Sequence, residues 1–184
     1  MVHPYPAYCA SFSYVGRHCY LLTFVTFMRM AAFTQPAVVD LAWSQILRAA
    51  REKQFEVLAY TFMPDHVHLV VEGMTDSSDL KAFAKLAKQY SGYYYARGHG
   101  GGKLWQKGLD DRIIRDEVEL LDRVRYVVNN PVAAGLVTRP EDYAFLGSQR
   151  WTCTQLLDWC QGKTPKPSDD STDDGASNHP AGQI

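Results

Sequence analysis

Residues 55–72 read FEVLAYTFMPDHVHLVVE, and this stretch decides the fold. The segments Phe55–Phe62 and His66–Glu72 are rich in β-branched and aromatic side chains, which favour strands. Between them, Met63-Pro64-Asp65 predicts a turn, because proline fixes its own backbone and aspartate favours tight turns. The stretch therefore predicts a β-hairpin.

The chain before the hairpin contributes one strand and one helix. Tyr20–Phe27 is rich in β-branched and aromatic residues and predicts the first strand. Pro36 opens a helix that runs to about Lys53, with apolar residues at helical spacing. The order of these segments is strand, helix, strand, strand.

The chain after the hairpin continues the alternation. Ser77 or Ser78 is expected to cap a helix from Asp79 to about Ala96, which the cluster Gly98–Gly102 ends.

A strand and a helix follow the glycine cluster. Asp111–Arg115 predicts the fourth strand. Asp116 then caps a helix from Glu117 to about Asn129, which Pro131 stops. The residues of this helix expected to face inward are Val118, Leu121, Val124 and Val128.

The predicted order β-α-β-β-α-β-α is typical of an α+β protein with a ferredoxin-like split βαβ sheet. Such a sheet has one face covered by helices and one free face. Residues 1–160 are expected to form a single domain that ends in a packed C-terminal extension. Residues 161–184, rich in proline, aspartate and serine, predict a disordered acidic tail.

Composition excludes several classes of protein. With 184 residues, 46% of them hydrophobic and 12% aromatic, the chain is neither disordered nor collagen-like, nor a disulfide-dense miniprotein. The most apolar run, Cys19–Phe33, is too short to span a bilayer and contains Arg29. No signal sequence is recognisable, so we expect a cytoplasmic protein that does not contact membranes.

The net charge of −1 averages two different regions. Residues 164–184 carry one lysine and four aspartates, a net charge of −3, so the remainder is +2. Within Lys81–Arg125, ten basic residues oppose six acidic ones. This excess suits a polyanionic partner, although a solvated surface has the same signature.

His66-Val67-His68 lies on the second strand of the hairpin. Side chains alternate across a strand, so both imidazoles share the face opposite the apolar Val67 and Leu69. They are close enough together to bind one divalent metal ion. Two surface histidines on a half-exposed strand would show the same spacing.

Tyr126 and Asn130 lie four residues apart on the last predicted helix and so share one face of it. Packing at the rim of the core would explain Tyr126, and a C-cap ahead of Pro131 would explain Asn130. In combination with the histidines they allow a reaction, because a tyrosine hydroxyl can attack a DNA phosphate. A divalent cation would polarise the phosphoryl oxygen.

Four motifs in the same order are similar to those of the single-tyrosine HUH (IS200-like) transposases, and within them the REP-associated tyrosine transposases. The resemblance extends from about Tyr14 to Trp151. Its motifs are MPDHVHLVV (63–71), LWQKG (104–108), DRIIRD (111–116) and YVVNNPVAAGLV (126–137). Leu109 departs from the family pattern at a slot where an aromatic residue is expected, and the acidic tail lies outside the pattern.

The resemblance implies a metal-dependent endonuclease and strand transferase. Tyr126 would be the nucleophile, and His66, His68 and Asn130 would hold Mg²⁺ or Mn²⁺. The implied substrate is single-stranded DNA near imperfect hairpins, cut to leave a 5′-phosphotyrosine and a free 3′-OH. The protein would act as a monomer or homodimer. The alternatives are a rolling-circle-type HUH nickase and a ferredoxin-like DNA-binding protein that has lost catalysis.

Several further residues are candidates for contacts to DNA. Phosphate contacts are expected from Lys103, Lys107, Arg112 and Arg115, and also from Arg97. A solvated basic edge is the alternative. The aromatic residues able to stack on unpaired bases are Tyr90, Tyr93, Tyr94 and Tyr95, for which packing at the helix end is the alternative.

Overall fold

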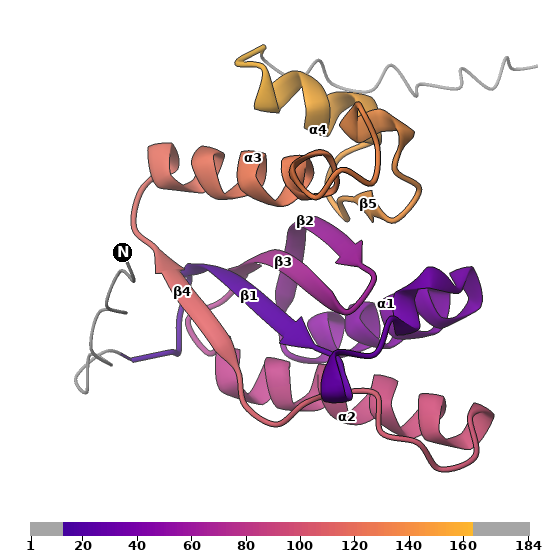
Figure 1. Cartoon of the computed structure of the whole chain (residues 1–184). Helices are drawn as coiled ribbons and strands as arrows, with labels where there is room; N and C mark the ends of the chain where they lie inside the picture. The colour runs from indigo at the N-terminus through magenta and orange to yellow at the C-terminus, as the bar shows by residue number, and fades with distance from the viewer. Residues whose placement is uncertain (1–12, 164–184) are drawn as a thin grey trace, which may run out of the picture.

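A five-stranded antiparallel sheet organises the computed structural model, which describes residues 13–163 (Figure 1). Its strands are β1 (Cys19–Val25), β2 (Phe55–Met63), β3 (His66–Gly73), β4 (Asp110–Ile114) and β5 (Leu146–Gly147). Their order across the sheet is β4-β1-β3-β2-β5. Because β3 lies between β1 and β2, and β1 between β3 and β4, each βαβ unit is split by a strand of the other. The α+β fold class is confirmed.

Helices lie on both faces of the sheet (Figure 1). On one face lie α1 (Pro36–Glu52) and α2 (Leu80–Gly98), and on the other lie α3 (Glu117–Ala133) and α4 (Cys153–Cys160). The expectation of a free second face therefore needs correction. Leu58 and Val70 point to that side and are buried there, because α3 and α4 supply the apolar surface that covers them.

The larger core lies between the sheet and the pair α1 and α2. Antiparallel pairing places Tyr20, Leu22 and Phe24 of β1 beside apolar residues of β3, with Leu22 opposite Leu69. These side chains are fully buried. A second, smaller core joins the sheet to α3 and α4, and its buried members are Leu58, Ala59, Val70, Ile114, Val124, Val127, Val128 and Leu156.

An irregularity in β2 serves both cores. The pairing of β2 with β3 shifts register between Val57 and Ala59, so one extra residue enters the strand there. Val57 packs in the larger core, and Leu58 packs in the smaller one. Because of this bulge, Ala59 also packs in the smaller core, so two consecutive side chains of β2 are buried on the same side of the sheet.

The helix α3 differs from its sequence-based prediction. Pro131 does not stop it, and the helix continues to Ala133. Proline lacks the N–H that would bond the carbonyl of Val127. The Thr61 hydroxyl of β2 donates to that carbonyl instead, at 2.8 Å, and so keeps it paired. Val118 does not face inward but is 74% exposed.

The cap of α2 also differs from the prediction. Asp79 caps the helix, since its carboxylate accepts a hydrogen bond from the Ala82 N–H. Ser78 is buried, and its hydroxyl donates to the carbonyl of Gln54. Ser78 therefore ties α2 to the loop after α1 and does not cap it.

The predicted C-terminal extension is packed against the sheet. A capping box of Thr152 and Gln155 begins α4, and Trp151 packs against Trp159. The short strand β5 pairs with β2, which the sequence analysis did not predict. Residues 164–184, most of the predicted acidic tail, lie outside the described residues. Within residues 13–163, no helix is both long and apolar enough to cross a membrane.

Candidate active site

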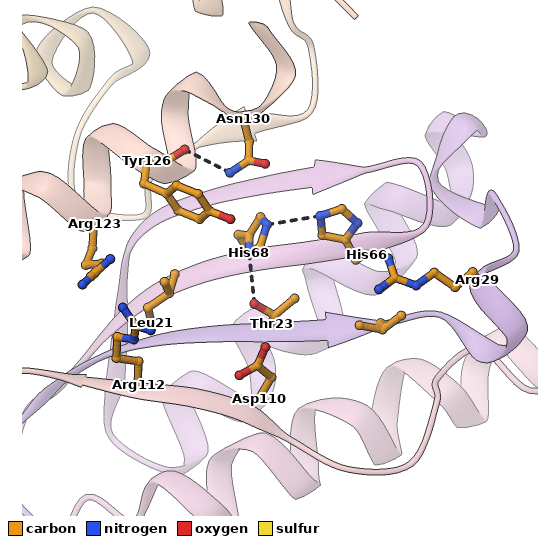
Figure 2. A pocket seen from close by; sticks show the side chains of 11 residues that line it. Leu21, Thr23, Arg29, His66, His68, Asp110, Arg112, Arg123, Tyr126 and Asn130 are labelled. Carbon is orange, nitrogen blue, oxygen red and sulfur yellow. Dashed lines mark hydrogen bonds between the residues drawn. The ribbon is translucent and has the colours of Figure 1, made fainter. Parts of the chain in front are cut away.

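A cleft of about 450 Å³ lies between α3 and the face of the sheet that carries the histidines (Figure 2). Its lining comes from β1, β3, β4, α3 and the turn after β1. The residues are Leu21, Thr23, Val25, Arg29, His66, His68, Asp110, Arg112, Arg123, Tyr126 and Asn130. All four residues predicted for metal binding and attack therefore line one cavity.

The two histidines lie side by side on β3 in this cleft (Figure 2). Their Nε2 atoms are 3.1 Å apart, and their rings are nearly perpendicular. Each Nδ1 atom has a partner of its own: His68 Nδ1 is 3.0 Å from the Thr23 hydroxyl, and His66 Nδ1 is 2.6 Å from the Asp65 carboxylate. A histidine that donates through Nδ1 keeps the lone pair on Nε2.

This arrangement fits a shared cation. Without a metal ion, one Nε2–H donates to the other Nε2, and a cation bound to two unprotonated Nε2 atoms would replace this hydrogen bond. Nitrogen ligands about 2.1 Å from one ion and at roughly a right angle lie about 3 Å apart. The partners Thr23 and Asp65 are the kind of outer contacts that orient metal-binding imidazoles.

Burial keeps His68 neutral. The side chain is only 6% exposed, and burial together with the neighbouring His66 lowers the pKa of His68 to about 4. At neutral pH the imidazole therefore carries a lone pair and no charge. That is the form a metal ligand requires.

Asp65 organises the turn end of the cleft. One carboxylate oxygen meets His66 Nδ1, and the other accepts a hydrogen bond from Arg29 at 3.2 Å. Partial burial opposes ionisation of Asp65, but the bonds from His66 and Arg29 outweigh it and lower the pKa of this carboxyl. Asp65 thus stays ionised and holds a histidine and an arginine at once.

Tyr126 reaches the histidines from α3. Its ring centroid lies 5.3 Å from that of His68, and its hydroxyl points toward the histidine pair in Figure 2. Tyr126 is 48% exposed and is not among the residues packed against either core, so packing at the rim of the core does not account for it. Asn130 lies one turn further along α3 and donates through Nδ2 to the carbonyl of Tyr126, which leaves its Oδ1 for another partner.

A third protein ligand would be an amide oxygen. Among residues 13–163, no group of three histidine, cysteine, aspartate or glutamate side chains could hold a metal ion. The histidine pair with Asn130 Oδ1 is the donor set that the cleft offers. The amide oxygen is a donor that suits Mg²⁺ and Mn²⁺, whereas imidazole nitrogens suit transition metals, and the open side of the cleft would leave positions for water and phosphate.

Cationic side chains lie at both ends of the cleft. Arg29 lies beside His66, and Arg112 and Arg123 lie at the far end, with Asp110 between the two ends (Figure 2). Three arginines against one aspartate make the cleft attractive to an anion. Arg112 was predicted from the sequence, and the other two arginines were not.

The remaining predicted phosphate contacts lie outside this cleft. Lys107 lines a neighbouring groove with Lys88, whose ammonium holds the carbonyls of Gln106 and Gly108. Lys103 lies over the ring of Phe27, and Arg97 contacts Tyr93 on α2. The exposed Arg115 follows β4.

The four predicted stacking tyrosines divide into two groups. The hydroxyl of Tyr90 donates to Glu52, and Tyr95 packs against the larger core. Packing therefore accounts for these two. Tyr93 and Tyr94 are 57% and 39% exposed. Leu109, at the slot expected to be aromatic, also packs against the larger core.

Thr23, Arg29 and Arg123 were missed by the sequence analysis. Each comes from a segment far in sequence from the histidines, and only strand pairing brings Thr23 opposite His68. Once β1 is known to pair with β3, the alternation of side chains along β1 places Thr23 on the same face as the histidines. This alternation is the sequence signal by which Thr23 could have been found.

Comparison with known proteins assigns the family. Residues 14–130 match the family described as "Transposase IS200 like", so the chain belongs to the IS200-like transposases. A REP-associated tyrosine transposase of Escherichia coli (strain K12) is 27% identical over 119 residues, which cover 62% of this chain and 68% of the relative.

A solved structure has the same fold. It is described as a REP-associated tyrosine transposase bound to a REP hairpin. The two chains superpose with a TM-score of 0.66 at 20% identity, over 98% of this chain and 100% of the other. The resemblance inferred from the motifs is thereby confirmed.

Proposed function

We propose that this transposase is a metal-dependent endonuclease and strand transferase that acts on single-stranded DNA beside hairpins. One observation carries the proposal: the Tyr126 hydroxyl points at two histidines whose Nε2 atoms face each other 3.1 Å apart. A nucleophile and a cation site thus share one cleft. Phosphodiesters resist attack by an oxygen nucleophile because they are negatively charged, and a cation bound beside the nucleophile offsets that charge.

Tyr126 would carry the covalent step. Its Oη would form a bond to phosphorus while the bond from phosphorus to the 3′ oxygen breaks. The hydroxyl proton would pass to water, and the departing 3′ oxygen would take up a proton from water to become a free 3′-OH. The downstream part of the cut strand would remain attached through its 5′ phosphate as a phosphotyrosine, and attack by another 3′-OH would reverse the step and join strands.

His66, His68 and Asn130 would hold the cation, Mg²⁺ or Mn²⁺. A bound cation would polarise the phosphoryl oxygen and offset its negative charge. Thr23 and Asp65 would keep both Nε2 lone pairs directed into the cleft. Asn130 is held by its own bond to the Tyr126 carbonyl, so the nucleophile and the third ligand would move as one unit of α3.

The arginines of the cleft would position the strand. Arg29 and Arg112 lie at opposite ends of it and would contact phosphates on either side of the cut. The solved relative was bound to a REP hairpin, which supports hairpin DNA as the partner. Lys103, Lys107, Arg115 and Arg97 would contact the DNA outside the cleft.

Tyr126→Phe tests the proposal most directly. The change removes one oxygen and keeps the ring, so we expect folding and DNA affinity to survive while cleavage vanishes. With Mn²⁺ and a hairpin-bearing single strand, the wild-type protein should form a DNA adduct that survives denaturing electrophoresis, and EDTA should abolish it. Tyr93→Phe and Tyr94→Phe are matched controls, since both tyrosines are exposed and lie outside the cleft.

Three outcomes would contradict the proposal. An adduct formed by Tyr126→Phe would assign the nucleophile elsewhere. Cleavage without an adduct would make water the attacking group. Hairpin binding without any cleavage would favour the catalytically silent DNA-binding protein.

A further inference from the structure

The turn after β1 has a costly backbone conformation. Met28 and Arg29 follow each other with φ angles of 53° and 54°, in the left-handed region that residues other than glycine rarely adopt. Two such residues in succession persist only where the surroundings enforce them. Glycine or asparagine at these two positions would reduce the strain, but the sequence has methionine and arginine there. The turn therefore keeps two large side chains in a costly conformation.

Hydrogen bonds from three segments enforce this turn. The Thr26 hydroxyl lies 2.8 Å from the carbonyls of both Met30 and Asp65, and the Thr26 N–H donates to the Asp65 carbonyl as well. The Phe27 N–H donates to the carbonyl of Leu104 at 2.8 Å. The turn is therefore a rigid part of the fold, tied to the same Asp65 that holds His66.

This rigid turn presents apolar side chains to solvent. Met28 is 81% exposed and Phe27 is 38% exposed, and neither belongs to a core. Cations flank them. The Lys103 ammonium lies 5.4 Å from the centre of the Phe27 ring, and Arg29 lines the cleft beside His66. An apolar surface flanked by two cations is complementary to an unpaired base, which is apolar on its faces and is flanked by two negatively charged phosphates.

We propose that Phe27 and Met28 form a platform for one unpaired nucleobase of the DNA strand that enters the cleft. The inference rests on the proposed function, because the cleft must hold that strand. Arg29 and Lys103 would contact the phosphates on either side of the stacked base. Aromatic rings stack on any base, and thioethers contact ring edges, so the platform would select unpaired bases and not a particular sequence.

Charge favours this occupant over a protein segment. Neighbouring phosphates complement the charges of Arg29 and Lys103, whereas an apolar helix would bring no negative charge to either cation. The turn also lies at the mouth of the cleft, where the strand must pass. Tyr93 and Tyr94 are also exposed, but no residue of α2 lines the cleft, whereas Arg29, which follows Met28, does.

A set of abasic probes tests the platform. The probe is hairpin DNA with an unpaired oligothymidine flank, in which one thymine at a time is removed to leave an abasic sugar. Affinity is measured in EDTA, so that no strand is cut. For the wild-type protein, we expect one flank position at which removal of the base weakens binding about fivefold or more.

Two variants should remove that dependence. Phe27→Leu keeps the bulk and loses the stacking face. Met28→Asn keeps the left-handed turn, which asparagine tolerates, so its melting temperature should equal or exceed that of the wild type. Both should bind intact DNA several-fold more weakly and lose no further affinity at the abasic position. Met74→Asn is the matched control, an exposed methionine after the opposite end of β3.

The outcomes separate this inference from the proposed function. If the wild type binds and cuts hairpin DNA but both variants match it on every probe, the platform is refuted and the proposed function stands. The same holds if the variants lose affinity yet still respond fully to the abasic position, because the loss is then structural. If the wild type binds no hairpin DNA at all, both proposals fail.

Discussion

Thr23 fixes the orientation of the His68 ring, one of the two histidines of the cleft. Its hydroxyl lies 3.0 Å from His68 Nδ1 and so determines which nitrogen of that ring faces the cleft. Thr23→Val keeps the shape and removes this bond, leaving a buried imidazole nitrogen without its partner. We expect a loss of stability of about 1 kcal/mol and metal affinity about 10-fold to 100-fold weaker. A titration of DNA cleavage against Mn²⁺ concentration would measure the shift.

The matched control for this change is Thr34→Val. The Thr34 hydroxyl donates to the carbonyl of Ala31 in an exposed turn that does not line the cleft. This variant should need no more Mn²⁺ than the wild type, whereas His68→Ala should not cut at any concentration. An unchanged Mn²⁺ requirement in Thr23→Val would show that the threonine does not orient the ligand.

Sequence reasoning identified residues whose neighbours are close along the chain. His66 and His68 share a strand face because side chains alternate, and Tyr126 and Asn130 share a helix face because they are four residues apart. These local rules could not place the two pairs in one cleft; the family resemblance did. Arg123 lies three residues before Tyr126 and so shares its helix face, a local signal that the sequence-based prediction did not use.

At the scale of elements, α3 depends on β2 for its continuity. Pro131 has no N–H to donate to the Val127 carbonyl, so this carbonyl would be unpaired if the Thr61 hydroxyl did not donate to it. Thr61→Val should therefore destabilise the protein by about 1–3 kcal/mol, since it leaves a buried carbonyl unpaired. Urea denaturation would measure the change in the free energy of unfolding.

A double-mutant cycle would isolate this effect. Pro131→Ala restores an N–H at position 131, which can bond the Val127 carbonyl without help from Thr61. In that background Thr61→Val should cost less, with an interaction energy of about 1 kcal/mol. Strictly additive losses would show that the hydroxyl does not compensate for the proline.

The boundaries of elements were the least predictable feature. The rule that proline ends a helix was wrong at Pro131, because the Thr61 side chain of β2 donates a hydrogen bond to the Val127 carbonyl that proline leaves unpaired. Ser77 and Ser78 suit a helix cap locally, but burial of Ser78 against Gln54 left that place to Asp79. The order of strands and helices was predictable because apolar periodicity is local, whereas these exceptions depend on contacts between distant segments.

At the scale of the whole molecule, charge is divided between the body and the C-terminal residues. Residues 164–184 carry a net charge of −3, whereas three arginines and one aspartate line the cleft. A chain ended after Lys163 should keep its melting temperature and cleavage rate, because both cores and the cleft lie within residues 13–163. Its affinity for hairpin DNA should rise slightly at low salt and match that of the full chain at high salt.

Calorimetry and binding titrations at two salt concentrations would check this expectation. Loss of cleavage by tenfold would show that the C-terminal residues take part in the reaction. A gain in affinity that persists at high salt would show that they block the cleft by direct contact and not by charge.

The edge position of β4 also bears on how the protein behaves at high concentration. In the described part of the chain β4 has a sheet neighbour on one side only, and three of its five residues are charged. Charges on an edge strand discourage it from pairing with another chain and so from aggregating. Arg112 therefore opposes self-association through the edge of the sheet, and it also lines the cleft. A variant designed to weaken the proposed DNA contact of Arg112 should therefore reverse the charge, as in Arg112→Glu, because a neutral residue would also remove a charge that opposes aggregation.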